Sequence, residues 1–318
     1  MQLHGIHHIT AITADARRNL SFYAELLGLR FVKKTVNFDD PTAYHLYYGD
    51  ERGTPGSILT FFEYPGAPLG RAGDGMIHRL VWRVAGEPAL DFWNERLARA
   101  GVRVERSQAA LRFSDPEGLG LELSATGDDE PALSAASAGV PPAVALRGFD
   151  GVRAYGTDPQ ASERALGEVL GFERSGAALD GGVWGEALWR VGAGGRSSGY
   201  VYDPAPSARG VQGAGTVHHI AWAVPDADQP AWRERIVSGG LYATPVIDRT
   251  YFRSVYFREP SGVLFEIATL GPGFAIDEPQ ARLGEALRLP PRYEHLRPRL
   301  ERLLTPLVSP REREREAA

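Results

Sequence analysis

The order of hydrophobic and polar positions along the chain repeats four times. Each unit opens with a short run of strand-forming residues, continues into a segment whose apolar residues fall on one helical face, and closes with three more strand-like runs. A chain of four such βαβββ modules in two tandem halves predicts an α+β fold. The units open at Ile6-His7-His8, Met76-Ile77-His78, Phe149-Asp150-Gly151 and His218-His219.

The helix boundaries are marked in every unit. In the first unit Asp15 is a favourable N-cap, Leu20, Tyr23 and Leu27 share one face, and Gly28 supplies a stop. The other helices are expected around residues 90–97, after Asp158-Pro159 and over residues 231–237, each followed by glycine: Gly101, Gly171 and Gly239-Gly240.

The closing hairpins of the second and fourth units match most clearly. Residues 113–123 parallel residues 257–267, and each segment has a Pro and a Gly in the turn between β-forming residues. Residues 125–145 are mostly small and polar and contain Pro, which is typical of a linker. We therefore expect an N-terminal half over residues 1–130, a C-terminal half over 146–270 and a helical tail over 271–318. Within the tail, helices are expected around 280–287 and 293–304, with a frayed charged end over 310–318.

The composition limits the chemistry. The 318 residues are 43% hydrophobic and 24% charged, as in an ordinary soluble globular protein. A formal net charge of -5 gives no reason to expect nucleic acid or an anionic membrane as a partner. The chain has no Cys, which excludes disulfides, thiolate metal sites and Cys nucleophiles. No apolar run approaches the ~20 residues of a membrane span and no signal peptide is recognisable, so we expect a cytoplasmic protein.

Two His-His pairs, His7-His8 and His218-His219, open strand-like runs far apart in the chain, and one carboxylate, Glu266, stands in an apolar strand. A charged residue in such a strand is normally paired or bound to a cation. Two imidazoles and one carboxylate form a facial metal site with open positions. Such a site suits an iron(II) oxygenase better than a structural zinc.

Strand parity suggests which side chains share a face. Residues two apart point the same way, so His8 points with Thr10 and His7 points oppositely. His7, like its counterpart in the second pair, therefore has either a supporting role or a role in the active site. Folding the last hairpin about Ser261 sets Tyr256 opposite the strand carboxylate, where cross-strand neighbours are only about 5 Å apart.

The repeated module resembles that of the vicinal oxygen chelate superfamily, which contains glyoxalases, bleomycin resistance proteins and extradiol dioxygenases. The resemblance covers nearly the whole chain. Within the superfamily, the sequence is similar to the hydroquinone ring-cleaving dioxygenases. The segments that carry this similarity are residues 5–10 (Gly-Ile-His-His-Ile-Thr), His218-His219, residues 249–266 and residues 289–294 (Leu-Pro-Pro-Arg-Tyr-Glu).

The resemblance implies that His8, His219 and Glu266 hold the metal, which joins unit one to unit four. It implies Fe(II), with Mn(II) as an alternative, and a small aromatic diol and O2 as the reactants. The catalytic roles that it implies are a hydrogen bond from the Tyr256 phenol to the substrate oxygen, stabilisation of negative charge by Arg249, and orientation of substrate or proton transfer by Thr10, His7 and His218.

Units two and three would then form a counterpart cup. His78 and Glu122 occupy ligand-like positions there, but Gly151 stands where the other His belongs, so we interpret this cup as vestigial. In the cup with the complete ligand set, the closing strand of unit one offers only Thr60 or Phe62 as a fourth ligand, and neither is suitable. The metal would keep open positions for substrate and O2.

Two other functions remain open. A glyoxalase-like lyase or isomerase would use zinc, nickel or cobalt without oxygen, and a non-catalytic aromatic-binding or resistance protein would need no complete ligand set. His4, His45 and His295 have no partner pattern and are expected to be surface or structural residues. The natural substrate and the oligomeric state, a homo-oligomer included, are left open by the sequence.

Overall fold

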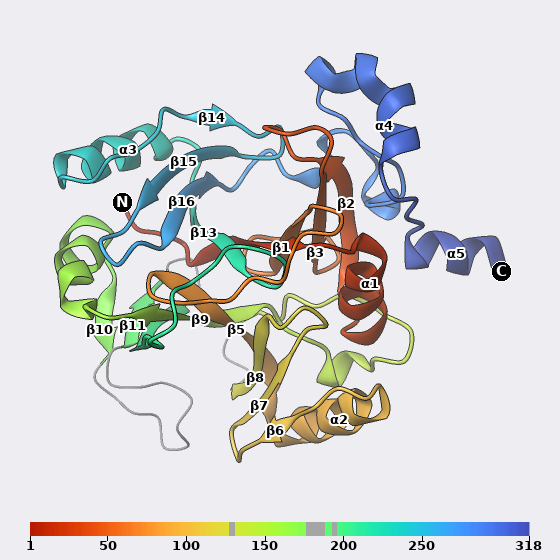
Figure 1. Ribbon diagram of the computed structural model, residues 1–318, viewed down its shortest axis with the longest axis horizontal. Coiled ribbons are helices and arrows are strands. Elements are labelled where there is room, and N and C mark those ends of the chain that lie inside the picture. Colours follow the sequence, from red (N-terminus) through yellow and green to blue (C-terminus); the bar gives the residue numbers. More distant parts are fainter. Residues whose placement is uncertain (127–130, 176–187, 193–195, 318) are drawn as a thin grey trace.

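The strands form two mixed sheets of eight strands each, with helices on their outer sides (Figure 1). The computed structural model describes residues 1–126, 131–175, 188–192 and 196–317. The α+β architecture of four βαβββ modules is confirmed. Within the described residues, no helix is both long enough and apolar enough to cross a membrane.

Modules one and four build the first sheet. Module one consists of β1 (Ile6–Thr13), α1 (Ala16–Leu20), a π-helical turn η1 (Ser21–Leu26), β2 (Arg30–Val36), β3 (Tyr44–Gly49) and β4 (Ile58–Glu63). Module four consists of β13 (Val217–Val224), α3 (Gln229–Ser238), β14 (Ile247–Asp248), β15 (Arg253–Arg258) and β16 (Leu264–Thr269). The strand order is β14-β15-β16-β13-β1-β4-β3-β2.

Modules two and three build the second sheet in the order β10-β11-β12-β9-β5-β8-β7-β6. Module two consists of β5 (Met76–Ala85), α2 (Gly86–Arg99), β6 (Glu105–Arg106), β7 (Ala110–Ser114) and β8 (Gly120–Thr126). Module three consists of β9 (Phe149–Gly156), η3 (Pro159–Ser162), η4 (Ala165–Val169), β10 (Glu173–Ser175), β11 (Leu188–Val191) and β12 (Ser198–Pro204). A 3-10 turn, η2 (Pro142–Val144), lies in the linker.

The predicted start and end of the first helix are found in the structure. The Asp15 side chain accepts hydrogen bonds from the backbone N–H groups of Arg17 and Arg18, at 3.0 and 3.1 Å. These bonds satisfy donors that a helix start leaves free. The chain turns out of the helical segment at Gly28, whose φ of 72° is accessible to glycine without strain.

At the centre of each sheet, one antiparallel strand pair joins two modules. β1 pairs antiparallel with β13, which joins the first module to the last, and β5 pairs antiparallel with β9. In the first sheet, each central strand also pairs in parallel with the closing strand of its own module, β1 with β4 and β13 with β16. The centre of the first sheet therefore carries the strands of both His-His pairs and of Glu266.

The C-terminal tail differs from the expected helices. Residues 280–287 do not form a helix: they contain only the 3-10 turn η6 (Gln280–Arg282), and Leu287 forms a parallel bridge with Lys34 of β2. Here the tail covers the outer edge of the first sheet, where an unpaired strand would expose its backbone groups. The helical pattern over 293–304 corresponds to the turn η7 (Pro291–Leu296) and α4 (Arg297–Leu303), and a further turn, η5 (Phe274–Ile276), precedes them.

The charged chain end is helical instead of frayed. Residues Pro310–Ala317 form α5, which lies beside the first module in Figure 1. Arg311 pairs with Glu51, with 2.9 Å between Nη1 and Oε2, and Ser309 is buried. These tertiary contacts hold a segment that local composition alone would leave loose.

Three basic residues of β2 attach the tail. Lys33 is fully buried, and its Nζ donates to the Phe274 carbonyl at 3.0 Å and to Asp277 at 2.7 Å. Lys34 donates to the Leu307 carbonyl and Arg30 to the Gln280 carbonyl, both at 2.7 Å. A buried cation needs this number of partners because it has lost its hydration.

Replacing Lys33 by Met should lower the free energy of unfolding by about 3 kcal/mol, because Asp277 and the buried Glu278 lose their shared cation. Urea unfolding followed by circular dichroism measures this change. The matched control is Arg99→Met, which removes an exposed pair with Glu95 and should change stability by about 0.5 kcal/mol or less. Equal losses in the two variants would show that the tail is not held through Lys33.

Candidate metal centre

The predicted ligands His8, His219 and Glu266 converge on one face of the first sheet. His8 lies opposite Ala221 across the β1–β13 pair, and Ala221 in turn lies beside Glu266 across the β13–β16 pair. His219 precedes Ala221 by two residues and so shares its face. All three side chains are at least 97% buried, since their exposed fractions are 1%, 3% and 0%.

The three ligand atoms form a nearly equilateral triangle. His8 Nε2 lies 3.3 Å from His219 Nε2 and 3.4 Å from Glu266 Oε2, and the third side, from His219 Nε2 to Oε2, is 3.0 Å. Oε2 is buried and makes no hydrogen bond of acceptable geometry to either ring. An orphaned carboxylate oxygen facing two imidazole nitrogens fits a cation bound at about 2.0–2.2 Å from each atom. Among the described residues, this is the one group of His and acidic side chains close enough to share an ion.

The electrostatics favour the ligand forms of these groups. Burial opposes ionisation of Glu266, yet the adjacent His8 and His219 hold the pKa of this carboxyl well below its ordinary value. Burial is also the main cause that lowers the pKa of His219, which keeps its imidazole neutral. A neutral imidazole and an ionised carboxylate are the forms that bind metal.

The first histidine of each pair contacts the second, contrary to the expected opposite orientation. His7 Nδ1 lies 2.9 Å from His8 Nδ1, and His218 Nδ1 lies 2.8 Å from His219 Nδ1. The physical reason is a shift in the β1–β13 register at both places, between Ile6 and His8 and again at His218. Such a bulge breaks the simple alternation of strand faces.

These contacts fix the tautomers of the candidate ligands. A ring that offers its Nε2 lone pair to a metal carries its proton on Nδ1, and His8 and His219 can donate that proton to His7 and His218. Burial lowers the pKa of His7 to about 3, so this ring is a neutral acceptor. His218, which is exposed, contacts His219 in the same way. Phe252 packs against His7 and His8, with both ring centroids 4.9 Å away, and holds the first pair in place.

The hairpin pairing of Tyr256 with Glu266 is found as predicted, and Ser254 supports the same carboxylate. Tyr256 lies directly opposite Glu266 in the β15–β16 register, and Ser254 donates to Oε1 at 2.5 Å. Oε1 is thereby occupied, which leaves Oε2 for an ion. Burial and the nearby charge of Glu266 raise the pKa of Tyr256, so its phenol keeps its proton and is a hydrogen-bond donor.

The residues predicted to be catalytic do not all face the same space. Tyr256 and Arg249 line a small cavity together with His8 and His219. Thr10 lies behind this cavity, fully buried, and its hydroxyl accepts a hydrogen bond from Thr60 at 2.8 Å. His7 is buried and His218 is exposed; each contacts a candidate ligand, and neither lines the cavity.

His45 is the main cavity residue that the sequence analysis did not place in the site. Of the two expected positions, surface or structural, the structure shows a largely buried, hydrogen-bonded residue, and it lines the same cavity. Its Nε2 lies 2.8 Å from the Thr60 hydroxyl and its Nδ1 lies 2.8 Å from the Tyr47 hydroxyl. The strand pairing contains a signal for this position. His45 pairs with Phe62 on β4, and β4 neighbours β1, the strand that carries His8.

An ion pair between Arg249 and Asp39 lies at the cavity. Its volume is about 30 Å³, whereas a cavity of about 150 Å³ is known to hold benzene. Both terminal nitrogens of the Arg249 guanidinium donate to Asp39, at 2.9 and 3.1 Å, and the group lies 5.5 Å from the Tyr256 ring centroid. Asp39 belongs to the loop between β2 and β3, so admission of an aromatic ring requires this loop and the Arg249 side chain to separate.

The second sheet corrects one predicted equivalence. Glu122 pairs with Val81 as Glu266 pairs with Ala221, so the counterpart of His219 is Arg79 and not His78. His78 lies in a register shift of β5, where it bonds Asp203 at 2.8 Å and stacks on Tyr155 with 3.8 Å between ring centroids.

The other equivalent positions of the second sheet follow from the same registers. Gly151 takes the place of His8, as expected from the sequence. Arg112 lies opposite Glu122 as Tyr256 lies opposite Glu266. In the second sheet, arginines stand where the first sheet has an imidazole and a phenol.

Comparisons with known proteins identify the family of the chain. Residues 5–123 and 148–267 match the family described as the Glyoxalase/Bleomycin resistance protein/Dioxygenase superfamily. A Bacillus subtilis (strain 168) protein named "Putative ring-cleaving dioxygenase MhqO" is 44% identical over 95% of this chain and 96% of its own. The chlorohydroquinone/hydroquinone 1,2-dioxygenase of Sphingobium indicum is 32% identical over 96% and 98%.

Solved structures extend the comparison. A crystal structure of a Bacillus subtilis protein described as a "putative dioxygenase" superposes with a TM-score of 0.88 at 43% identity, and the match covers 96% of this chain and 98% of that one. Glyoxalase I from Zea mays shares the fold alone, with a TM-score of 0.58 at 13% identity over 84% of this chain and 92% of that one. The chain belongs to the Glyoxalase/Bleomycin resistance protein/Dioxygenase superfamily.

Proposed function

We propose that the protein is an Fe(II)-dependent dioxygenase that cleaves the ring of hydroquinone-type aromatic diols with O2. The observation that carries the proposal is the buried triangle of His8, His219 and Glu266, with an orphaned carboxylate oxygen and no fourth protein ligand within the described residues. Two imidazoles and one carboxylate are the donor set of non-haem iron oxygenases. The names of the relatives at 32–44% identity support both the reaction and the diol.

Iron, when bound to His8, His219 and Glu266, would supply the redox chemistry that couples the diol to O2. The protein side chains orient the reactants. The protonated Tyr256 phenol donates a hydrogen bond to a substrate hydroxyl oxygen, and the Arg249 guanidinium stabilises negative charge on that oxygen. His7 and His218 keep the ligand tautomers, and Thr10 with Thr60 anchors the back of the site.

Entry of the substrate requires the ion pair between Arg249 and Asp39 to open. Opening gives the ring access to the apolar side of the cavity, which Phe38, Phe62 and Phe252 line. Closure around the ring then excludes water and strengthens the contacts of the ring with charged groups. The same arginine therefore serves as part of the gate and as a substrate contact.

The two rival functions fit less well. A glyoxalase-like isomerase needs a fourth protein ligand, yet Thr60 is engaged with Thr10 and His45, and Phe62 has no donor atom. A binding protein without catalysis has no use for a completely buried carboxylate held between two tautomer-fixed imidazoles.

The test of the proposed function is oxygen uptake by iron-loaded protein. With hydroquinone, an oxygen electrode should record consumption of one O2 per diol, and zinc-loaded protein should consume none because zinc has no redox chemistry. Cleavage of catechol but not hydroquinone would correct the diol class. If no dihydroxybenzene causes oxygen uptake and the protein shows isomerase activity when loaded with a divalent metal, the glyoxalase-like function replaces the proposal.

Changing Glu266 to Gln should weaken iron binding by at least about tenfold and abolish ring cleavage, because a neutral amide removes the charge that offsets the cation. Iron content after gel filtration, measured by atomic absorption, reports the first effect. The control Glu63→Gln alters another buried carboxylate, one that accepts from Ala16 and Thr305, and it should retain iron. Full iron occupancy in Glu266→Gln would mean that another group completes the site.

Changing Tyr256 to Phe should reduce kcat by about 10²-fold with little loss of iron, because the phenol contacts substrate and not the metal. Turnover and metal content are measured on the same preparation. Tyr47→Phe is the matched control, since that phenol lines the same cavity but bonds His45. Parallel loss of iron and turnover in Tyr256→Phe would identify the residue as a ligand or a structural support.

A further inference from the structure

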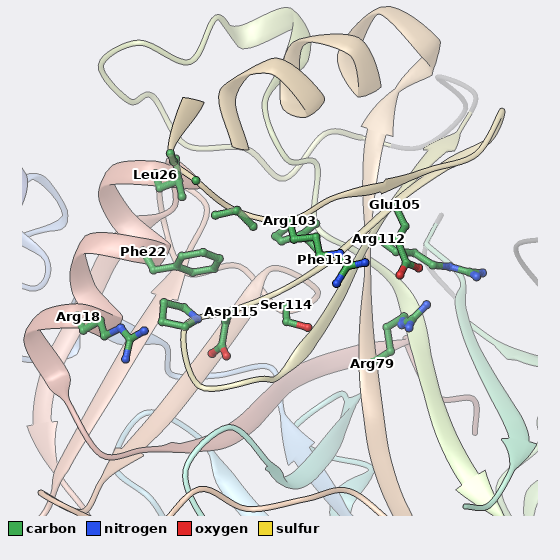
Figure 2. A pocket seen from close by; sticks show the side chains of 14 residues that line it. Arg18, Phe22, Leu26, Arg79, Arg103, Glu105, Arg112, Phe113, Ser114 and Asp115 are labelled. Atoms are coloured by element: carbon green, nitrogen blue, oxygen red, sulfur yellow. The ribbon is translucent and has the colours of Figure 1, made fainter. Parts of the chain in front are cut away.

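A second and much larger cavity lies away from the candidate metal centre. It has a volume of about 570 Å³ and lies between the helical segment of module one and the edge of the second sheet (Figure 2). Phe22 and Leu26 line it on the side of module one, and Arg112 and Phe113 of β7 line it on the side of module two. This volume falls within the range of about 300–1,000 Å³ that is typical of small-molecule sites.

Guanidinium groups dominate the lining of this cavity. Glu105 and Asp115 are the carboxylates that line it, and Asp115 is turned toward the backbone N–H groups of Glu117 and Leu119, both at 2.8 Å. Two of the arginines, Arg18 and Arg103, make no ion pair with any residue in the described part of the chain, and both are exposed. The lining arginines are Arg18, Arg79, Arg103 and Arg112.

Two of these arginines are fixed in advance. The completely buried Glu122 accepts from Arg112 Nε at 2.7 Å and from Arg79 Nη1 at 3.3 Å, so one carboxylate holds two guanidinium groups. The arrangement keeps an excess positive charge at the cavity wall and leaves further N–H donors on both side chains. A ligand meets side chains whose rotational freedom is already restricted, which favours binding.

The register of the second sheet relates this arrangement to the metal centre. Arg79 and Arg112 occupy the positions that His219 and Tyr256 occupy in the first sheet, around a carboxylate at the same place. The cup that lacks metal ligands thus carries fixed cations of its own. Its chemistry is suited to an anion, whereas the chemistry of the first cup is suited to a metal and a neutral diol.

We propose that this cavity binds a small organic anion, with a carboxylate or phosphate group on a flat apolar body. The guanidinium groups bind the anionic group through paired, charge-assisted hydrogen bonds. Phe22, Leu26, Val102 and Phe113 contact the apolar body. The site is independent of the metal centre, so its occupancy does not require the ring-cleaving reaction.

Isothermal titration of the full-length, iron-loaded protein tests the proposal with phenyl phosphate, terephthalate and the neutral terephthalamide. Phenyl phosphate, terephthalate or both should bind, more weakly as salt rises, and terephthalamide should not. The double variant Arg18→Gln/Arg103→Gln should lower the affinity at least about tenfold, because it removes two charged contacts while sparing the buried Glu122 pairs. Binding of one probe alone identifies the anionic group that the site prefers.

Two control variants locate the binding. Arg17→Gln changes the neighbouring residue of α1, whose guanidinium Nε is directed to the Pro306 carbonyl, and it should retain full affinity. Arg249→Gln removes the cation of the metal centre and should also leave the affinity unchanged. The proposal is overturned if neither anionic probe binds at low millimolar concentration, if the double variant binds as the unaltered protein does, or if Arg249→Gln alone abolishes binding.

Discussion

The antiparallel pairing of β1 with β13 is the contact on which the rest of the molecule depends. It brings together His8 and His219, which are 211 residues apart in the chain. Since β13 also pairs in parallel with β16, the same strand aligns Glu266 with both imidazoles. A fully buried carboxylate is unfavourable unless its charge is compensated. Ser254 donates a hydrogen bond to one oxygen, and the other oxygen faces two ring nitrogens, an arrangement that could hold a cation.

The two sheets resolve the same electrostatic problem in two ways. Each has a glutamate at the equivalent position of a central closing strand, and each glutamate is fully buried. Around Glu266 the neighbours are two imidazoles and a protonated phenol. Around Glu122 they are Arg79 and Arg112, which are permanently charged. A common backbone register therefore supports opposite chemistry, because only the side chains that surround the carboxylate differ.

The four modules could be predicted from local periodicity and repetition, whereas the pairing of unit one with unit four and the candidate ligand set of His8, His219 and Glu266 followed from the resemblance to the vicinal oxygen chelate superfamily. The prediction of side-chain orientation from strand parity failed where two strands shift register. The bulges at His7 and His218 turn adjacent imidazoles toward each other, and the shift in β5 puts Arg79 at the position assigned to His78. Parity predicts side-chain direction from the position of a residue along its own strand, whereas a bulge depends on how that strand pairs with its partner.

In the tail, too, a prediction from local sequence was wrong because tertiary contacts determine the structure. The amphipathic pattern of residues 280–287 is compatible with a helix, but the segment lies along β2, where Arg288 N donates to the Lys34 carbonyl at 2.8 Å. Tertiary contacts outweigh intrinsic propensity in such a short segment. The surroundings of His45 could not be derived from its own strand alone, because they combine Tyr47 of β3 with Thr60 of β4 and Arg249 of the loop before Phe252.

The pairing of the first module with the last also governs the order in which the chain can acquire its structure. Modules two and three are neighbours in sequence, so β5 can find β9 while synthesis continues. One edge of β1, however, has no partner until residues 217–224 have been made. Contacts between such distant segments form slowly, and an unpaired strand edge is prone to association with other chains. The ligand triangle is thus completed only after β16 has been synthesised, and until β13 is available one edge of β1 stays unpaired.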